Sequence, residues 1–203
     1  MTEEHLRAVA DSLDVDDIGA RPDEGKLAEL LLVVAEELAD DRFGGATKVN
    51  KVLFFAEFAH VRMTGRPITG AVFQKLRHGP APRRLVPARE RLLAQGDAVL
   101  EREVVLGREQ HRLRPLRPAQ RDLFSTSELQ AVTDAVAWLS GRSGSEVSAL
   151  SHEEPGWQLV GEGENIPFAT AYLMTDQLSG SPRVKARAEQ IAAAYARRIA
   201  DER

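Results

Sequence analysis

One stretch of the chain, Thr47–Met63, has apolar residues on two sides of the helix that its pattern predicts. At about 100° per residue, one apolar stripe is interrupted only by His60, and a second stripe lies on the opposite side. A helix with two apolar faces is normally buried on both. This helix therefore either runs through the middle of a domain or keeps one face for a partner. The first stripe comprises Val49, Val52, Leu53, Ala56, Ala59 and Met63, and the second comprises Phe54, Phe58 and Val61.

The residues before this stretch predict a second amphipathic helix over 27–41. Apolar residues recur there with the spacing of one helical face, and Asp23 is a suitable capping residue for its first turn. Gly44 and Gly45 then break the helix, and Thr47 is the expected cap of the next one. A connection this short predicts that the two helices pack side by side, as an αα-hairpin or a helix-turn-helix.

The segment after Met63 changes from helical to turn-rich composition. Ala71–Leu76 resembles a short strand and leads into an elbow, His78-Gly79-Pro80, where proline favours an extended glycine and a fixed turn. A basic helix is predicted over 84–95, with Pro87 in its first turn. Gly96 ends this helix.

Residues 97–116 give the clearest hairpin signal in the chain. If Gly107-Arg108 forms a two-residue type II′ turn, Glu103 lies opposite Arg112, and Glu101 lies opposite Arg114. Opposite charges that face each other across strands stabilise a hairpin by roughly 0.2–1 kcal/mol per pair. Two helices, an elbow, a basic helix and a hairpin together resemble a winged helix-turn-helix.

The last third of the chain returns to helical patterns. Ser125 or Ser127 can cap a helix through Leu139, a short helix follows over 146–150, and a final one begins at Ser181-Pro182. The predicted fold class is mainly α with a small β-hairpin: a winged-helix-like core with C-terminal helices. We expect an acidic N-terminal segment (1–22) with a short helix over Glu3–Leu13, a central domain (23–175) and a C-terminal helix (176–203).

Composition limits the chemistry that the chain can perform. It has 203 residues and no cysteine, which removes disulfides, thiol nucleophiles and thiolate metal sites. No apolar run approaches the roughly 18 residues of a membrane span, and the acidic start is unlike a signal peptide. We therefore expect a cytoplasmic protein without a membrane partner.

Charge is unevenly distributed along the sequence. Residues 1–41 carry 13 acids and 3 bases, a net charge of −10, whereas residues 42–118 carry 6 acids and 16 bases, a net charge of +10. The basic segment 42–118 can attract nucleic acid such as promoter DNA, or an acidic protein. It can equally be neutralised by the acids of the chain's own N-terminal part.

Residues suited to catalysis or metal binding are sparse. His152 with Glu153 and Glu154 can be metal ligands or an acid–base pair, but the spacing offers them no converging partner. His60, on an apolar stripe, is more typical of a hydrogen-bonded core histidine than of a ligand. No phosphate-binding loop, zinc-protease motif or nucleophile elbow is present. We expect no catalysis, no cofactor and no metal.

Two parts of the sequence together resemble the Panacea domain, known from SocA-like antitoxins. They are the run KVNKVLFFAEFAHVRMTGRPITGAVFQKLRHGPAP and, about seventy residues later, LSHEEPGW. His78 stands where the family usually has an aromatic residue, and Gly156 separates Pro155 from Trp157. The matching segments are Lys51–Ala56, Gly65–Ile68, Phe73–Lys75, His78–Pro80 and Ser151–Trp157. The resemblance implies a non-enzymatic antitoxin that neutralises a protein toxin encoded beside it.

Two functions from different classes follow from these observations. The first is an antitoxin that binds a cognate protein toxin directly; the second is a winged-helix-like DNA-binding regulator that uses the basic helix and hairpin. Antitoxins can also bind their own promoter, so the two are compatible, and a homo-oligomer is compatible with both. For toxin binding we predict the second face of the helix Thr47–Met63, its flanking cations, the elbow and the tryptophan segment: Lys51, Phe54, Phe58, Val61, Arg62, Gln74, His78, Gly79, Pro80, His152 and Trp157.

Overall fold

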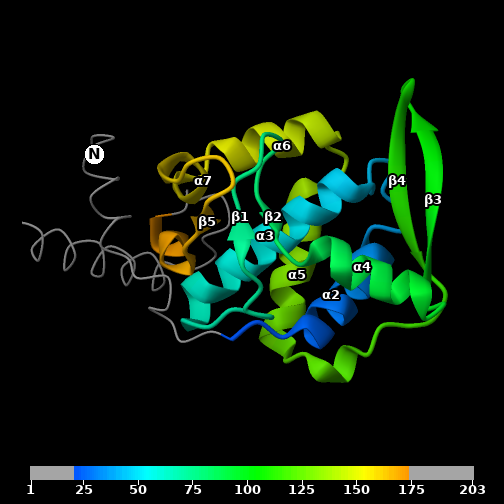
Figure 1. The fold of residues 1–203 in the computed structure, drawn as a ribbon, viewed down its shortest axis with the longest axis horizontal. Helices are drawn as coiled ribbons and strands as arrows, with labels where there is room; N and C mark the ends of the chain where they lie inside the picture. Colours follow the sequence, from blue (N-terminus) through cyan, green and yellow to red (C-terminus); the bar gives the residue numbers. More distant parts are fainter. Residues whose placement is uncertain (1–20, 174–203) are drawn as a thin grey trace, which may run out of the picture.

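The computed structural model of the protein describes residues 21–173. The predicted helices at Glu3–Leu13 and from Ser181 onward lie outside the described residues. Within them, helices surround one central helix, α3 (Ala46–Thr64), and two small antiparallel sheets flank the bundle (Figure 1). The fold is therefore mainly α with a small β component, as the sequence predicted.

Helix α3 is buried on both apolar faces, as its two stripes indicated. It packs against α2 (Glu24–Glu37), α5 (Thr126–Leu139) and α6 (Gly144–His152). The predicted cap is wrong, because Gly45 and not Thr47 precedes the first turn, and no side chain caps it. The position requires glycine, because a Cβ at residue 45 would lie 2.8 Å from Oε1 of the Gln110 side chain. Gly65 ends α3 in the left-handed conformation.

Helix α2 begins directly after its predicted cap, three residues before the predicted range, and ends four residues before the end of that range. Asp23 accepts a hydrogen bond from the Lys26 backbone N–H at 2.8 Å, which confirms it as the cap. The chain then leaves the helix after Glu37. The Leu38 and Asp41 carbonyls each accept one backbone N–H in this turn, and the Arg112 guanidinium also donates to them, at 3.0 and 2.7 Å.

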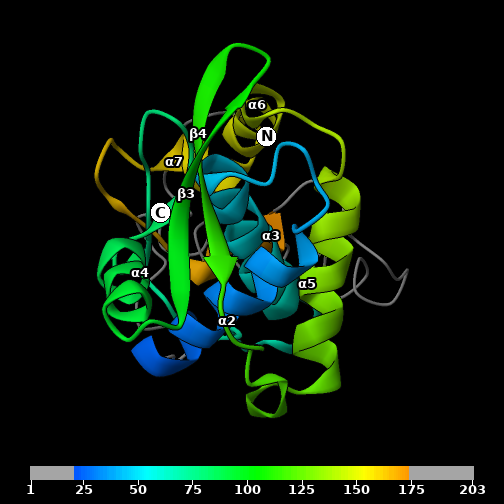
Figure 2. The same ribbon diagram turned by 90° about the vertical axis from the view of Figure 1, so that its right-hand side faces the viewer.

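The predicted hairpin is present, but its register differs from the prediction. Strands β3 (Ala98–Val105) and β4 (Arg108–Pro115) follow α4 (Leu85–Ala94), and the hairpin tip extends beyond the helices (Figure 2). The turn residues are Leu106 and Gly107, both with positive φ, and Glu103 lies opposite Gln110 rather than Arg112. Positive φ at both positions defines a type I′ turn, whose twist matches that of the strands. The proposed type II′ turn is therefore wrong.

A second sheet joins the elbow to the C-terminal part of the described chain. Strand β1 (Phe73–Gln74) pairs with β2 (Ala81–Pro82) on one side and with β5 (Asn165–Ile166) on the other. The strand-like segment 71–76 is confirmed at its centre. Its pairing with β5 brings the helix α7 (Pro155–Leu159) beside the elbow (Figure 1).

The second face of α3 lies in the hydrophobic core. Phe54, Phe58 and Val61 are at most 1% exposed. Phe73 of β1 lies 5.6 Å from the Phe58 ring centre, and Phe168 of the 3₁₀ helix η2 (Phe168–Leu173) lies 5.0 Å from it. Of the two alternatives that the sequence leaves open for this helix, the structure shows burial within the domain, because β1 and η2 cover the face that we predicted to bind the toxin.

Candidate functional site

The elbow lies directly on Lys51 of α3 and Ser151 of α6. Gly79 has a φ of +97°, and a Cβ at this position would lie 2.6 Å from Lys51 Nζ and would overlap Ser151 Oγ. The elbow is therefore fixed, as predicted, but Gly79 is not in the extended conformation that its following proline favours. Only glycine allows both this φ and this close approach.

Lys51 is buried without a carboxylate partner among residues 21–173. Its side-chain ammonium donates to the Pro80 carbonyl at 3.2 Å, and the residue is 2% exposed. Burial lowers the pKa of Lys51 to about 7. Lys48, one turn earlier and equally buried, forms a 2.7 Å ion pair with Asp41. Of the two buried lysines on α3, only Lys51 lacks a compensating charge among the described residues.

Trp157, at the start of α7, contacts two side chains beside the elbow, the His152 imidazole and the Lys75 ammonium. The His152 ring stacks on its indole at 4.1 Å with an interplanar angle of 19°, and Lys75 Nζ lies 4.1 Å from the indole centre. The indole N–H donates to the Leu76 carbonyl at 3.3 Å. Cation–π and stacking contacts of this kind order all three side chains. We call Lys75, Arg77, His78, His152 and Trp157 the elbow surface.

The elbow surface is electropositive. Burial lowers the pKa of His152, and the neighbouring charges of Lys51, His78 and Lys75 lower it further. No carboxylate contributes to this shift. His152 Nε2 is buried and has no hydrogen-bond partner in the described part of the chain. An acidic group is the natural complement of such a surface.

The structure brings together six of the predicted site residues and separates the others from them. Phe54, Phe58 and Val61 are core residues, and Arg62 is half-buried three turns beyond Lys51, roughly 16 Å along α3. Gln74 lies in β1, opposite Ala81 and Asn165. The residues that converge are Lys51, His78, Gly79, Pro80, His152 and Trp157.

Sequence reasoning did not single out Lys75 or Ser151 for this site. Lys75 binds Trp157 and also donates to the Val160 carbonyl at 2.8 Å, and Ser151 Oγ donates to the Ser148 carbonyl at 2.8 Å. Both lie inside the segments that carry the family resemblance. Their position inside these segments is the sequence feature that could have identified Lys75 and Ser151 as site residues.

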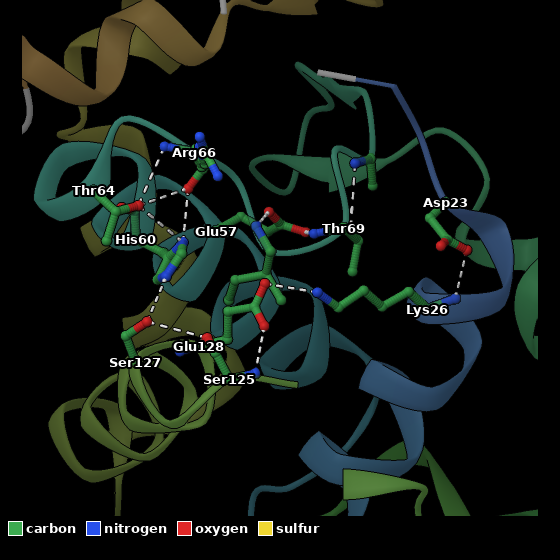
Figure 3. Close-up of polar contacts among 12 residues, drawn as sticks. Asp23, Lys26, Glu57, His60, Thr64, Arg66, Thr69, Ser125, Ser127 and Glu128 are labelled. Atoms are coloured by element: carbon green, nitrogen blue, oxygen red, sulfur yellow. Dashed lines mark hydrogen bonds and ion pairs between the residues drawn. The ribbon is translucent and has the colours of Figure 1, made fainter. Parts of the chain in front are cut away.

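On its other side, α3 fixes the loop that follows it through two buried polar residues (Figure 3). Glu57 accepts hydrogen bonds from the backbone N–H groups of Ile68 at 2.7 Å and Thr69 at 2.9 Å. Burial raises the pKa of Glu57 to about 7, although these donors oppose the shift. His60 contacts the Arg66 carbonyl at 2.7 Å and Ser127 Oγ at 3.2 Å, which confirms it as a hydrogen-bonded core histidine.

The N-terminal acids neutralise part of the basic segment 42–118. Glu24 pairs with Arg84 at 2.6 Å, Glu29 with Arg117 at 2.5 Å, and Asp41 with Lys48 at 2.7 Å. Two of these pairs attach the basic helix and the end of the hairpin to α2. Part of the positive charge of segment 42–118 is thus neutralised by ion pairs within the protein.

Two further observations bear on the predicted chemistry. Among residues 21–173, no group of three histidine, aspartate or glutamate side chains is placed to hold a metal ion. No helix in that range combines the length and apolar character needed to cross a membrane.

Comparison with protein families matches residues 49–158 to the family model described as "Antitoxin SocA-like, Panacea domain". The matched range begins in the first turn of α3 and ends in α7, so it contains Lys51, the elbow and Trp157. Neither the curated proteins nor the solved structures give a match to the chain.

Proposed function

The chain belongs to the SocA-like antitoxin family with the Panacea domain, and on this premise we propose that it neutralises a cognate protein toxin by direct binding. The binding site of this proposal is the elbow surface. This proposal rests on the meeting of two segments that lie about seventy residues apart in the sequence. They contact each other at Gly79 and Trp157, and both lie within the range that matches the family. Neutralisation by contact requires no catalysis, cofactor or metal.

The composition of the elbow surface supports a protein partner. Trp157 is half-buried, so it offers an aromatic face held rigid by its neighbours, while Arg77 and His78 are exposed. Tryptophan and arginine are enriched among the residues that dominate binding energy at interfaces. The positive charge favours an acidic surface on the toxin. This site replaces the buried second face of α3 as the proposed contact.

The test is co-expression with the toxin encoded beside this protein. Arg77→Glu with His78→Glu reverses charge on the elbow surface at two exposed positions, so the thermal transition should stay unchanged while rescue of toxin-expressing cells is lost. Arg102→Glu with Arg108→Glu, two exposed cations on the hairpin, is the matched control and should rescue fully. Full rescue by the folded elbow variant would show that the toxin binds another surface.

Lys51 is unsuitable for charge reversal in this test. Because it is 2% exposed, a glutamate at this position would bury an unpaired carboxylate and unfold the protein. A loss of rescue would then report folding and not binding.

The DNA-binding alternative remains a prediction. The winged-helix-like arrangement would use α4 and the hairpin, but Arg84 and Arg117, which flank them, are already paired with α2. Binding to promoter DNA is tested by the salt dependence of a gel shift with the upstream DNA. A cytoplasmic location fits the toxin-binding proposal, and a homo-oligomer is tested by light scattering.

A further inference from the structure

The elbow surface carries positive charge that the described part of the chain does not neutralise. Lys75 and the buried Lys51 both donate to neutral backbone carbonyls, at 2.8 and 3.2 Å. Their charges, with that of His78, lower the pKa of His152, and no carboxylate among residues 21–173 opposes this shift. Arg77 and His78 are exposed, and within the same range their side chains form no hydrogen bond or ion pair.

Two described acids lie next to this surface in the fold, and neither pairs with it. Glu164 approaches through its backbone, because its carbonyl accepts the Lys75 N–H at 2.9 Å, but its carboxylate accepts the Gly161 N–H at 2.6 Å. Glu153 follows His152 directly and forms no ion pair among the described residues. Neutralisation of the elbow surface therefore requires acids from outside residues 21–173.

Two parts of the chain lie outside the described residues, and only one has the complementary charge. Residues 1–20 carry six acids and one base, a net charge of −5, whereas residues 174–203 carry four acids and six bases, a net charge of +2. A positive surface attracts the first part and repels the second. The acids of the first part are densest over 11–17, where four of the seven residues are aspartate.

The segment 11–17 also matches the apolar part of the elbow surface. Leu13 and Val15 alternate with its aspartates. On the elbow, Leu76 is 37% exposed, and its carbonyl accepts the indole N–H of the half-buried Trp157. Segments in which acids alternate with aliphatic residues are typical of binding segments that combine charge with apolar contact.

The attachment point of the segment allows it to reach the elbow. The Asp23 N–H donates to the Thr69 carbonyl at 2.9 Å, which fixes the start of the described chain beside the loop before β1. Thr69 is six residues from Lys75, at most about 22 Å, whereas Asp11 is twelve residues from Asp23 and can reach up to about 43 Å. A tether this short gives an effective concentration in the millimolar range, so a weak contact suffices.

We propose that residues 11–17 bind the elbow surface of their own molecule when no toxin is present, with their aspartates against Lys75, Arg77 and His78. The contact is a property of this chain alone, whereas its consequence for toxin binding rests on the proposed function. An acidic toxin must displace the segment, so only a partner that outcompetes four tethered aspartates gains the elbow.

The test uses the full chain, which has no cysteine, so Ser12→Cys supplies a single site for a nitroxide spin label. At about 50 mM salt, the Trp157 indole N–H signal in NMR should lose at least about half of its intensity relative to the reduced label, because the tether holds the label near the surface. The intensity should recover at about 500 mM salt, where charge is screened. It should not depend on protein concentration, since a contact with a second copy would weaken on dilution.

Matched variants with the same label identify the charges. Replacement of the four aspartates (Asp11, Asp14, Asp16 and Asp17) by asparagine should restore the Trp157 signal, and Arg77→Glu with His78→Glu should do the same from the other side. Glu3→Gln with Glu4→Gln, which also removes acids but outside 11–17, should leave the broadening unchanged. No broadening in the labelled parent, or broadening that persists in the aspartate variant, at high salt or only at high concentration, would overturn the proposal.

The consequence for the toxin is measured separately, with the unlabelled proteins and the toxin encoded beside this protein. A surface that is occupied half of the time binds its partner about two-fold more weakly, so the aspartate variant should bind the toxin at least about two-fold more tightly than the wild type. Equal affinities would overturn the competition. Broadening without any toxin binding would contradict the proposed function and not the contact, whereas toxin binding without broadening would contradict the contact alone.

Discussion

Arg112 and Glu103 form a 3.0 Å ion pair although they do not face each other in the hairpin. Gln110 is opposite Glu103 in the strand pairing. Arg112, two residues further along β4, reaches Glu103 diagonally. Arg114 contacts Glu101 with the same two-residue offset at 2.8 Å, and it also reaches Glu103, whose opposite residue lies four positions away, at 2.8 Å. The charge partners expected from the sequence therefore meet, across a strand pairing shifted by two residues.

Arg112 anchors the hairpin to α2, so its removal should be costly. It is 5% exposed and donates to the Leu38 and Asp41 carbonyls as well as to Glu103. Arg112→Leu should lower the free energy of unfolding by about 2–4 kcal/mol, because these acceptors lose a charged donor. Urea denaturation measures this value. Arg114→Leu, at a half-exposed site, should cost less than about 1 kcal/mol, and equal costs would contradict the assigned role.

Replacement of Lys51 by methionine should stabilise the protein in a pH-dependent way. The pKa of Lys51 is about 7 in the fold and about 10.4 in the unfolded chain. Below pH 7 the folded state carries the full cost of the buried charge. Between about pH 7 and 10.4 the unfolded chain binds more protons, so stability rises with pH. The gain from Lys51→Met should be a few kcal/mol below pH 7 and should disappear near pH 10.4.

Lys48→Met is the control for that measurement. Lys48 is paired with Asp41, so its removal leaves a buried carboxylate unpaired and should destabilise the fold by about 3 kcal/mol. Stabilisation by both substitutions would mean that the ion pair does not distinguish the two lysines.

Glu57 should give the protein a stability that falls as pH rises through the acidic range. Its pKa is about 7 in the fold and about 4.3 in the unfolded chain, so the folded state binds more protons between these values. Stability should therefore decrease from about pH 4.3 to pH 7, and Glu57→Gln should lack this decrease. Thermal melts across the range measure it. With Lys51 acting above pH 7, the wild-type profile should pass through a minimum near neutrality.

Gly79→Ala should destabilise more than the same change at Gly107. Both glycines have positive φ, but nothing lies within 4 Å of a Cβ at Gly107, whereas Lys51 and Ser151 occupy that space at Gly79. Gly107→Ala should cost about 1 kcal/mol from backbone strain alone. Gly79→Ala should cost at least about 2 kcal/mol more, because buried neighbours must move. Similar values from urea denaturation would contradict the close packing of the elbow.

Local patterns in the sequence predicted the helices, and contacts between distant segments account for what those patterns missed. Ser125 caps α5 with Glu128, a motif contained in four residues. In contrast, Phe58 is buried by Phe168, 110 positions later. A helical wheel of α3 cannot show that so distant a residue covers this face of the helix. The hairpin register depended on whether Leu106 accepts a positive φ, which is uncommon for leucine.

In the candidate site, too, the sequence predicted which segments take part but not the contacts that distant segments make with one another. The family resemblance identified the segments, and the buried position of Lys51 without a counter-charge emerged only when the elbow was placed over it. The contact of Lys75 with Trp157 likewise joins residues 82 positions apart.

The pairing of β1 with β5 sets an order of events during protein synthesis. Phe73 pairs with Ile166, so the strand beside the elbow cannot complete its sheet until the ribosome has released the chain beyond residue 166. A chain that stops before residue 155 carries α3 and the elbow but lacks α7 and its tryptophan, and one that stops before residue 165 lacks the strand that pairs with β1. A toxin partner that needs the whole elbow surface would thus ignore nascent and prematurely terminated copies and bind only finished molecules.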